Sequence, residues 1–512
     1  MAFRATSRSH GFGPRVRGPL ALLAVSALSL ALPLRARAYE ALVQASVSSQ
    51  SYQIRDAEGA KLGLQRLDTY LRLFITDLLP EREERSRAKP GAQMHIVMSM
   101  RMRADMGTFT RGWDPSSEAH GLDTWVSGAG RPTLELLNAH LAATDIAGFM
   151  DFKLGRLFQL DPLDFYGFDG LQARARLPFH LGLELVAGLR NSGHWAIDAP
   201  IFLADGTSLS DSRPGAFQPM VGAAVETHGL PWLRLRLAYR STWHFLAPGD
   251  VGSIYPGTTA ENVPRVTISE EKLTAYALGS FLGDRVTLYG GIRHNLLFGR
   301  LDEAQAGLAL RLGRSSQLRA EYVRDQPDFD GDSLFNIFNA VAYQEVRLWY
   351  EHRFSARWQA YLRATVRLFG GGEEGLDGEE GEALEPDVGG GVGVHYLGSR
   401  LAGRLDLYWQ EGYGGRTLGA LGFARVRIVP GWLDLEGRLV LAHWRDDLGL
   451  TPRGTTTGLT LGARLSLARQ IALHVLLEDN IGTHTQADLR LLALLDLSFC
   501  TAGYCPAGVV LP

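Results

Sequence analysis

The sequence predicts an all-β fold, namely a transmembrane antiparallel up-and-down β-barrel of about 18 to 22 strands with short periplasmic turns and long extracellular loops. Three observations predict it. From about residue 94 onward apolar and polar residues alternate, tight connections alternate with long ones, and tryptophans follow several tight turns. A period of 2 is typical of a strand with one apolar and one wet face, and a helix cannot produce it.

The alternation is clearest in residues 171–177, 232–240 and 358–369, where apolar side chains hold one parity and Arg, Gln or Thr gather on the other. Counting strands from Met94 gives about 20, and a further hairpin over residues 41–78 brings the total to about 22. An even number of strands leaves both chain ends in the periplasm.

The connections indicate which rim faces which compartment. Short links such as 229–231, 355–357 and 398–400 alternate with long ones such as 191–219 and 370–387. Outer-membrane barrels sort their connections in this way, with the short turns in the periplasm. Trp232, Trp358 and Trp432 each open a strand after a tight turn. They are therefore expected to form part of the periplasmic aromatic girdle.

The N-terminus predicts export. Residues 1–17 carry four Arg and no acid, residues 19–34 are apolar apart from two Ser, and Ala36-Arg37-Ala38 has the form of a cleavage site. The apolar stretch is too short for a membrane anchor. We therefore expect a signal peptide over 1–38, a barrel of the bacterial outer membrane over 39–499, and a C-terminal periplasmic tail over 500–512.

Composition excludes other classes. The chain has 512 residues, 46% hydrophobic and 21% charged, with a formal net charge of −3. Removing the six Arg of the signal peptide lowers the charge to about −9. This is no basic surplus for a nucleic-acid backbone, so nucleic acid is not an expected partner. The expected partners are outer-membrane lipid, the barrel assembly machinery and small anionic or polar solutes.

The two cysteines, Cys500 and Cys505, lie five positions apart near the C-terminus. In an exported protein they predict a local disulfide, with a pair of spare thiols as the alternative. A metal site is disfavoured because two thiolates without nearby His or further Cys do not complete four-coordination.

The motifs of catalysis and cofactor binding are missing: there is no G-x-S-x-G, H-E-x-x-H, Walker loop or zinc-spaced Cys/His cluster. We expect neither an enzyme nor a cofactor. Asp328, Asp330 and Asp332 lie in one predicted loop and offer a weak option for calcium. An ordinary solvated acidic loop explains them equally well.

The predicted lumen wall is rich in arginine. Taking the polar face of each strand as inward gives twenty Arg against eleven acids. Ladders of paired charges filling a closed lumen are one interpretation. The other is an anion-selective pore, because guanidinium is permanently charged and forks onto carboxylates and phosphates. The expected pore-lining residues are Arg101, Arg103, Arg174, Arg176, Arg234, Arg236, Arg240, Arg293, Arg363, Arg367, Arg404, Arg425 and Arg427.

A short motif near the fourth counted strand supports this class. Gly155-Arg156 followed by Phe168-Asp169-Gly170 resembles the "GR … FDG" hairpin of alginate-export-type and related bacterial porins. The resemblance implies passive diffusion through a fixed pore. Two features differ from the alginate-export group: the expected strand count is higher, and the chain continues beyond Phe499.

The sequence therefore predicts a porin-like channel for passive diffusion of small or oligomeric, preferentially anionic solutes. A TonB-type receptor is disfavoured because the segment before the first strands is too short for a plug domain. Two alternatives stay open. One is a phospholipase-like barrel hydrolase, which requires a Ser/His pair on the lipid face near the outer rim. The other is a non-conducting surface scaffold.

Overall fold

The computed structural model describes residues 40–56, 61–76, 78, 92–105, 108–110, 133–191, 218–245, 266–326, 342–370, 386–447, 453–483 and 485–500. All of its regular elements are strands. In chain order they are β1 (Glu40–Asp56), β2 (Lys61–Thr76), β3 (Gln93–Asp105), β4 (Thr108–Thr110), β5 (Thr133–Ile146), β6 (Met150–Asp161), β7 (Asp164–Leu177), β8 (Leu181–Arg190), β9 (Pro219–Thr227), β10 (Leu233–Phe245), β11 (Val266–Phe281), β12 (Val286–Asn295), β13 (Arg300–Leu312), β14 (Ser316–Asp325), β15 (Tyr343–Arg353), β16 (Trp358–Phe369), β17 (Pro386–Leu397), β18 (Leu401–Gly412), β19 (Gly415–Val429), β20 (Leu433–Asp446), β21 (Arg453–Ala468), β22 (Ile471–Gly482) and β23 (Thr485–Cys500).

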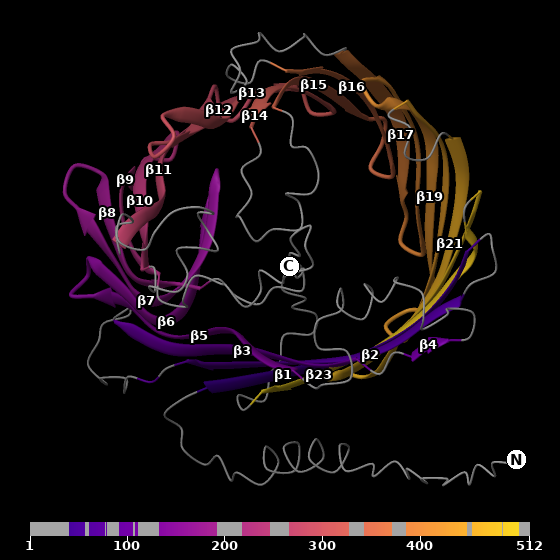
Figure 1. The fold of residues 1–512 in the computed structure, drawn as a ribbon, viewed down its shortest axis with the longest axis horizontal. Helices are drawn as coiled ribbons and strands as arrows, with labels where there is room; N and C mark the ends of the chain where they lie inside the picture. Colours follow the sequence, from indigo (N-terminus) through magenta and orange to yellow (C-terminus); the bar gives the residue numbers. More distant parts are fainter. Residues whose placement is uncertain are drawn as a thin grey trace, which may run out of the picture.

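The strands form one closed antiparallel ring (Figure 1). Apart from β4, each strand pairs with the next along the chain, with β3 pairing to β5. β23 pairs with β1 from Leu42 opposite Cys500 onward. The three residues of β4 continue the pairing of β3 along β2, so β3 and β4 share one position in the ring. Counted so, the 23 elements make a 22-strand barrel, which confirms the predicted fold class.

Alternation along the strands separates an outer from an inner face. On β16 the side chains of Leu362, Val366 and Leu368 are exposed, whereas Arg363 and Arg367 between them are partly covered. The exposed set forms an apolar outer surface, as lipid requires, and the intervening polar set faces the lumen. The parity predicted from the sequence is thus the parity of the barrel wall.

Aromatic side chains gather where the short turns lie. Trp232, Trp358 and Trp432 are each about half exposed beside a tight turn. Trp232 packs 6.3 Å from Phe281 and Trp358 packs 4.9 Å from Tyr396, between ring centroids. This arrangement is typical of an interfacial belt. In the described part of the chain, no helix is long and apolar enough to cross a membrane.

The closed ring, the even strand number, the apolar outer face and the aromatic belt identify a barrel of the bacterial outer membrane. The strands begin at Glu40, two residues after the predicted cleavage site, and the last one ends at Cys500. The predicted signal peptide and C-terminal tail lie outside the described residues. β10 extends to Phe245, beyond the alternation over 232–240 that the sequence shows.

A buried apolar cluster lies on the inner side of the wall, at one side of the barrel. It consists of Leu157, Tyr166, Phe168, Val186 and Met220, from β6, β7, β8 and β9. In a simple barrel wall each of these strands would turn one face to lipid and one to water. The cluster therefore indicates that something lies over the inner wall there.

Candidate functional site: the lumen wall

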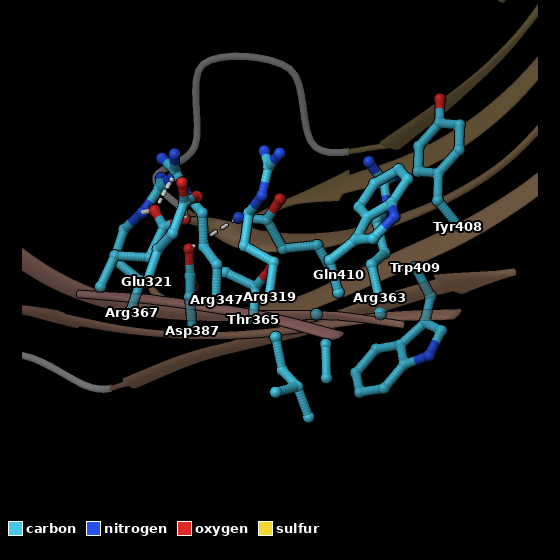
Figure 2. Close-up of a pocket in the computed structure, with 16 residues that line it drawn as sticks. Arg319, Glu321, Arg347, Arg363, Thr365, Arg367, Asp387, Tyr408, Trp409 and Gln410 are labelled. Atoms are coloured by element: carbon cyan, nitrogen blue, oxygen red, sulfur yellow. Dashed lines mark hydrogen bonds and ion pairs between the residues drawn. The ribbon is translucent and has the colours of Figure 1, made fainter. Parts of the chain in front are cut away.

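The inner wall of β14 to β18 brings several of the inward arginines together around one hollow. Across these strands the register places Arg319 opposite Trp349 and Trp349 opposite Arg363. Arg319, Arg347, Arg363 and Arg367 line a hollow of about 390 Å³. Figure 2 shows Arg319 and Arg363 projecting from one side of the wall and Trp409 from the other. Trp409 is exposed on the outer face, so the arginines point into the lumen.

Each of the three acids that line this hollow has a bonding partner, and for Glu345 the partners are arginines. Glu345 is held by Arg347 and by Arg367, the latter at 2.6 Å. Glu321 accepts a hydrogen bond from the Tyr289 hydroxyl. Asp387 accepts one from Gln410 Nε2 at 2.8 Å.

Arg319 and Arg363, by contrast, have no ion-pair partner among the residues that the structure describes. A guanidinium group that faces water without a carboxylate keeps its full charge and its fork of donors. The β14 to β18 wall therefore offers two arginines to an anion in the lumen.

Aromatic rings hold this part of the wall in shape. The Trp349 and Tyr361 rings stack with centroids 4.3 Å apart and planes 8° from parallel. The Tyr361 hydroxyl donates to Asp406 on β18. Arg363 lies across β17, where a Cβ on Gly391 would come within 2.6 Å of its Nε. The missing side chain on β17 thus leaves the room that Arg363 occupies.

Most of the arginines predicted to line the pore are engaged by acids. Of the thirteen, eleven contact a carboxylate: Arg101, Arg103, Arg174, Arg176, Arg236, Arg240, Arg293, Arg367, Arg404, Arg425 and Arg427. Arg234 and Arg363 do not, within the described strands. Several of these acids serve two arginines, as Asp434 does for Arg425 and Arg427, so paired arginines still outnumber their acids on β19 and β20.

Two of the predicted arginines are buried in ion-pair networks. Arg236 contacts Asp161 at 2.9 Å, Glu184 at 2.7 Å and Glu226 at 3.1 Å. Arg240, only 5% exposed, contacts Asp164 at 2.9 Å and Glu270 at 2.6 Å. Asp161 and Asp164 come from the distant β6–β7 hairpin, so sequence parity gave no sign of these contacts. Trp349 shares the parity of Arg347 and lies on the inner face, although it was not among the expected pore-lining residues.

The remaining predicted sites lie partly or wholly outside the described residues. Cys500 is disulfide-bonded, while its expected partner Cys505 lies outside the described residues, so the pairing stays a prediction. Asp328, Asp330 and Asp332 also lie outside them. Among the residues with described positions, no group of three His, Cys, Asp or Glu side chains is placed to hold a metal.

One serine–histidine contact bears on the hydrolase alternative. Ser316 Oγ lies 2.8 Å from His352 Nδ1, at the end of the barrel where the short turns lie. The alternative requires such a pair near the opposite rim. A triad histidine also turns Nδ1 to an orienting acid, whereas here Nδ1 meets the serine and the ring packs on Phe354, 4.6 Å between centroids. The pair does not have the geometry of a nucleophile and its base.

Comparison with known proteins gives a likeness of fold. No family model and no curated protein matches the sequence. Solved structures that resemble the chain include Pseudomonas aeruginosa OccK7 (OpdD), with 10% identity, 90% of this chain and 100% of that chain covered, and a TM-score of 0.41. Acinetobacter baumannii OccAB4 has 10% identity, with 91% of this chain and 100% of that chain covered and a TM-score of 0.39. A BenF-like porin from Pseudomonas fluorescens has 10% identity, with 90% of this chain and 99% of that chain covered and a TM-score of 0.39.

None of these three is named as an alginate exporter, so the resemblance to the alginate-export group stays a prediction. The structure does show what its motif builds. Gly155 pairs with Gly170 across β6 and β7, and Arg156 grips Asp169 with two hydrogen bonds of 2.7 and 2.8 Å. The "GR … FDG" residues therefore lie at three consecutive paired positions of one hairpin, with Phe168 opposite Leu157.

Proposed function

We propose that this protein is a porin-like outer-membrane channel through which small or oligomeric anionic solutes diffuse passively. The observation that carries the proposal is the inner wall of β14 to β18. There Arg319 and Arg363 face a hollow of about 390 Å³ that is lined by four arginines and three acids. No cofactor and no catalytic step are needed for this function.

Electrostatics supports the sign of the preference. Arginine stays charged at every physiological pH, so the wall attracts anions independently of titration. Charges on exposed surfaces are screened over about 8 Å at physiological salt, so acids outside the lumen act weakly on an ion within it. Rings of Arg or Lys on a pore wall favour anions for this reason.

The test is the reversal potential of the refolded protein in a planar bilayer under a salt gradient. We expect an anion preference that falls in the double variant Arg319→Gln/Arg363→Gln. Arg445→Gln is the matched control, because Arg445 is exposed at the end of β20 and already pairs with Asp447 at 2.9 Å. It should leave selectivity unchanged.

Two results contradict the proposal. A cation preference in the unmutated protein excludes the anion channel. A correctly folded barrel without conductance favours the scaffold alternative. A double variant that conducts with unchanged selectivity would show that other arginines, such as Arg234, set the preference.

A further inference from the structure

The β6–β7 hairpin leaves the barrel wall near its middle. β6 pairs with β5 no further than Arg156 opposite Ala139. β7 pairs with β8 no further than Phe168 opposite Arg190, with one more hydrogen bond from Asn191 N to Gly167 O. Beyond these points, from Phe158 opposite Gly167 to Asp161 opposite Asp164, β6 and β7 pair only with each other within the described strands. The hairpin end is thus free of both neighbouring strands.

A row of glycines marks the departure point. Gly155, Gly170 and Gly188 stand opposite one another on β6, β7 and β8. A Cβ on Gly155 would lie 2.2 Å from the Ala139 carbonyl oxygen, and one on Gly170 would lie 2.2 Å from that of Ala187. The backbones approach too closely for any side chain. Glycine in a strand is typical of such a sharp bend or close approach.

The hairpin tip docks on the inner wall of β10 to β12. Asp161 reaches Arg236 at 2.9 Å and Asp164 reaches Arg240 at 2.9 Å. The Leu163 carbonyl oxygen accepts a hydrogen bond of 2.8 Å from Arg293 Nη1, in the second half of β12. Since Arg236, Arg240 and Arg293 lie on the inner face, the tip lies inside the barrel.

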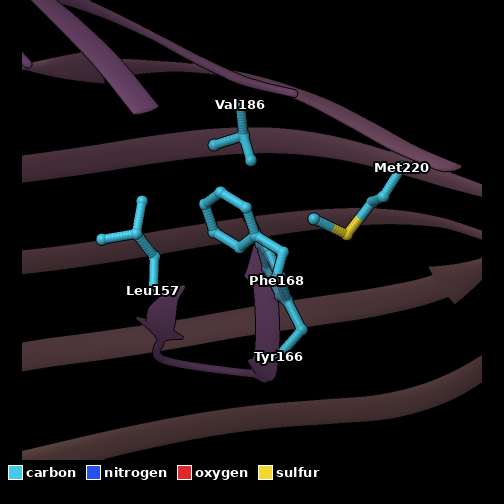
Figure 3. Close-up of a cluster of buried hydrophobic side chains, with 5 residues drawn as sticks. All are labelled: Leu157, Tyr166, Phe168, Val186 and Met220. Atoms are coloured by element: carbon cyan, nitrogen blue, oxygen red, sulfur yellow. The ribbon is translucent and has the colours of Figure 1, made fainter. Parts of the chain in front are cut away.

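The hairpin packs closely against the wall. Figure 3 shows the end of the hairpin in front of the wall strands, with Phe168 between Leu157 and the wall residues Val186 and Met220. Under the tip, between Asp164, Tyr166 and Arg240, the remaining hollow measures only about 10 Å³. Phe168 is fully buried. A solute therefore has no path on this side of the hairpin.

The other face of the hairpin carries apolar side chains, and Leu160 is the most exposed of them. Leu160 is 78% exposed, Phe165 is more than half exposed, and the Phe158 and Phe165 rings stack 5.9 Å apart. In an unbent strand this parity faces lipid, as Leu154 does below the glycine row. Because the hairpin end has folded inward, the same parity faces the lumen instead.

We infer that the β6–β7 hairpin is a fixed constriction of the lumen, which closes the side along β8 to β12 and presents the exposed Leu160 to a passing solute. A barrel of this strand number encloses a wide lumen unless something fills it. The role in conduction rests on the proposed channel function. The inward position of the hairpin does not.

A pair of matched substitutions tests that position without any conductance measurement. Leu160 and Leu154 share one strand and one parity on opposite sides of Gly155. Leu154→Arg should lower the folded fraction in lipid vesicles, because a charge on the lipid face is costly. Leu160→Arg should leave the folded fraction unchanged, because the side chain points into water. Equal losses in both variants would place the hairpin face in lipid and overturn the inference.

A shortened hairpin tests the constriction. We would replace residues 158–167 by Asn-Gly, which closes a two-residue turn between the paired residues Leu157 and Phe168. Arg236 keeps Glu184 and Glu226, and Arg240 keeps Glu270, so the wall retains its ion pairs. Single-channel conductance should rise about twofold or more, since it follows the open cross-section.

The outcomes separate the two proposals. A rise in conductance with the anion preference retained supports both. Unchanged conductance overturns the constriction while leaving the anion channel intact. Conductance only in the shortened protein supports a hairpin that blocks the lumen and contradicts passive diffusion through the natural protein. Absence of conductance in both proteins contradicts both proposals.

Discussion

The walls on the two sides of this barrel use the same residue for opposite purposes. On β10, Arg236 and Arg240 are buried against five carboxylates, two of them from the β6–β7 hairpin. On β14 and β16, Arg319 and Arg363 sit at the same inward parity and have no acid partner within the described strands. The difference is what lies over the wall. A covered wall needs its charges paired, whereas a wet wall does not.

The free-energy cost of an unpaired arginine differs between the two walls. Desolvating a charge is expensive unless a partner compensates it, so arginines under the hairpin are fixed parts of the structure. Arginines facing water cost little to keep unpaired, which leaves them available to a solute. A count of inward arginines made from the sequence does not distinguish the paired arginines under the hairpin from the unpaired arginines that face water.

The largest expected effect is the loss of a buried arginine. Arg240→Leu leaves Asp164 as a buried carboxylate without its ion-pair partner, whereas Glu270 keeps Arg190 and Lys272. Removing one member of a buried pair costs about 3 to 5 kcal/mol. Urea unfolding of the refolded protein in vesicles measures it. Arg363→Leu is the control and should cost little. Similar costs for the two substitutions would erase the distinction between the covered and the wet wall.

A smaller effect is expected from the outer face of the wet wall. Leu362 is 54% exposed on that face, next to inward Arg363. Leu362→Arg at mid-depth should destabilise the barrel by about 2 to 4 kcal/mol, because it places a charge in hydrocarbon. The same unfolding assay compares it with Arg363→Leu. A neutral Leu362→Arg would mean that the two faces of β16 are exchanged.

The smallest effect is expected at the bend below the hairpin. Gly170→Ala puts a Cβ within 2.2 Å of the Ala187 carbonyl oxygen and forces the strands apart, at about 1 to 3 kcal/mol. Gly403→Ala is the matched control in an unbent strand, where the nearest atom is 3.5 Å away. The difference between their unfolding midpoints measures the bend. If both are tolerated equally, the close approach of β7 and β8 is not required.

The sequence by itself determined the barrel. Side-chain direction in a strand follows parity alone, so the outward Leu362 and the inward Arg363 were assigned without any knowledge of their neighbours. The sorting of connections and the tryptophans at one rim follow from the two membrane interfaces, which act on every hairpin in the same way. The strand number of 22 lies within the predicted range, because each alternating segment of the sequence corresponds to one strand.

Only the tertiary structure decided where the lumen is closed. Asp161 and Arg236 are 75 positions apart, and no local pattern shows that they meet. Parity assigns Leu154 and Leu160 to one face, yet the glycine row between them sends Leu160 into the lumen. Parity is a property of a single strand, whereas the fate of an inward charge depends on what another segment brings to it. The sequence therefore predicts how many arginines face inward. Only the folded chain shows which of them pair with acids within the described strands.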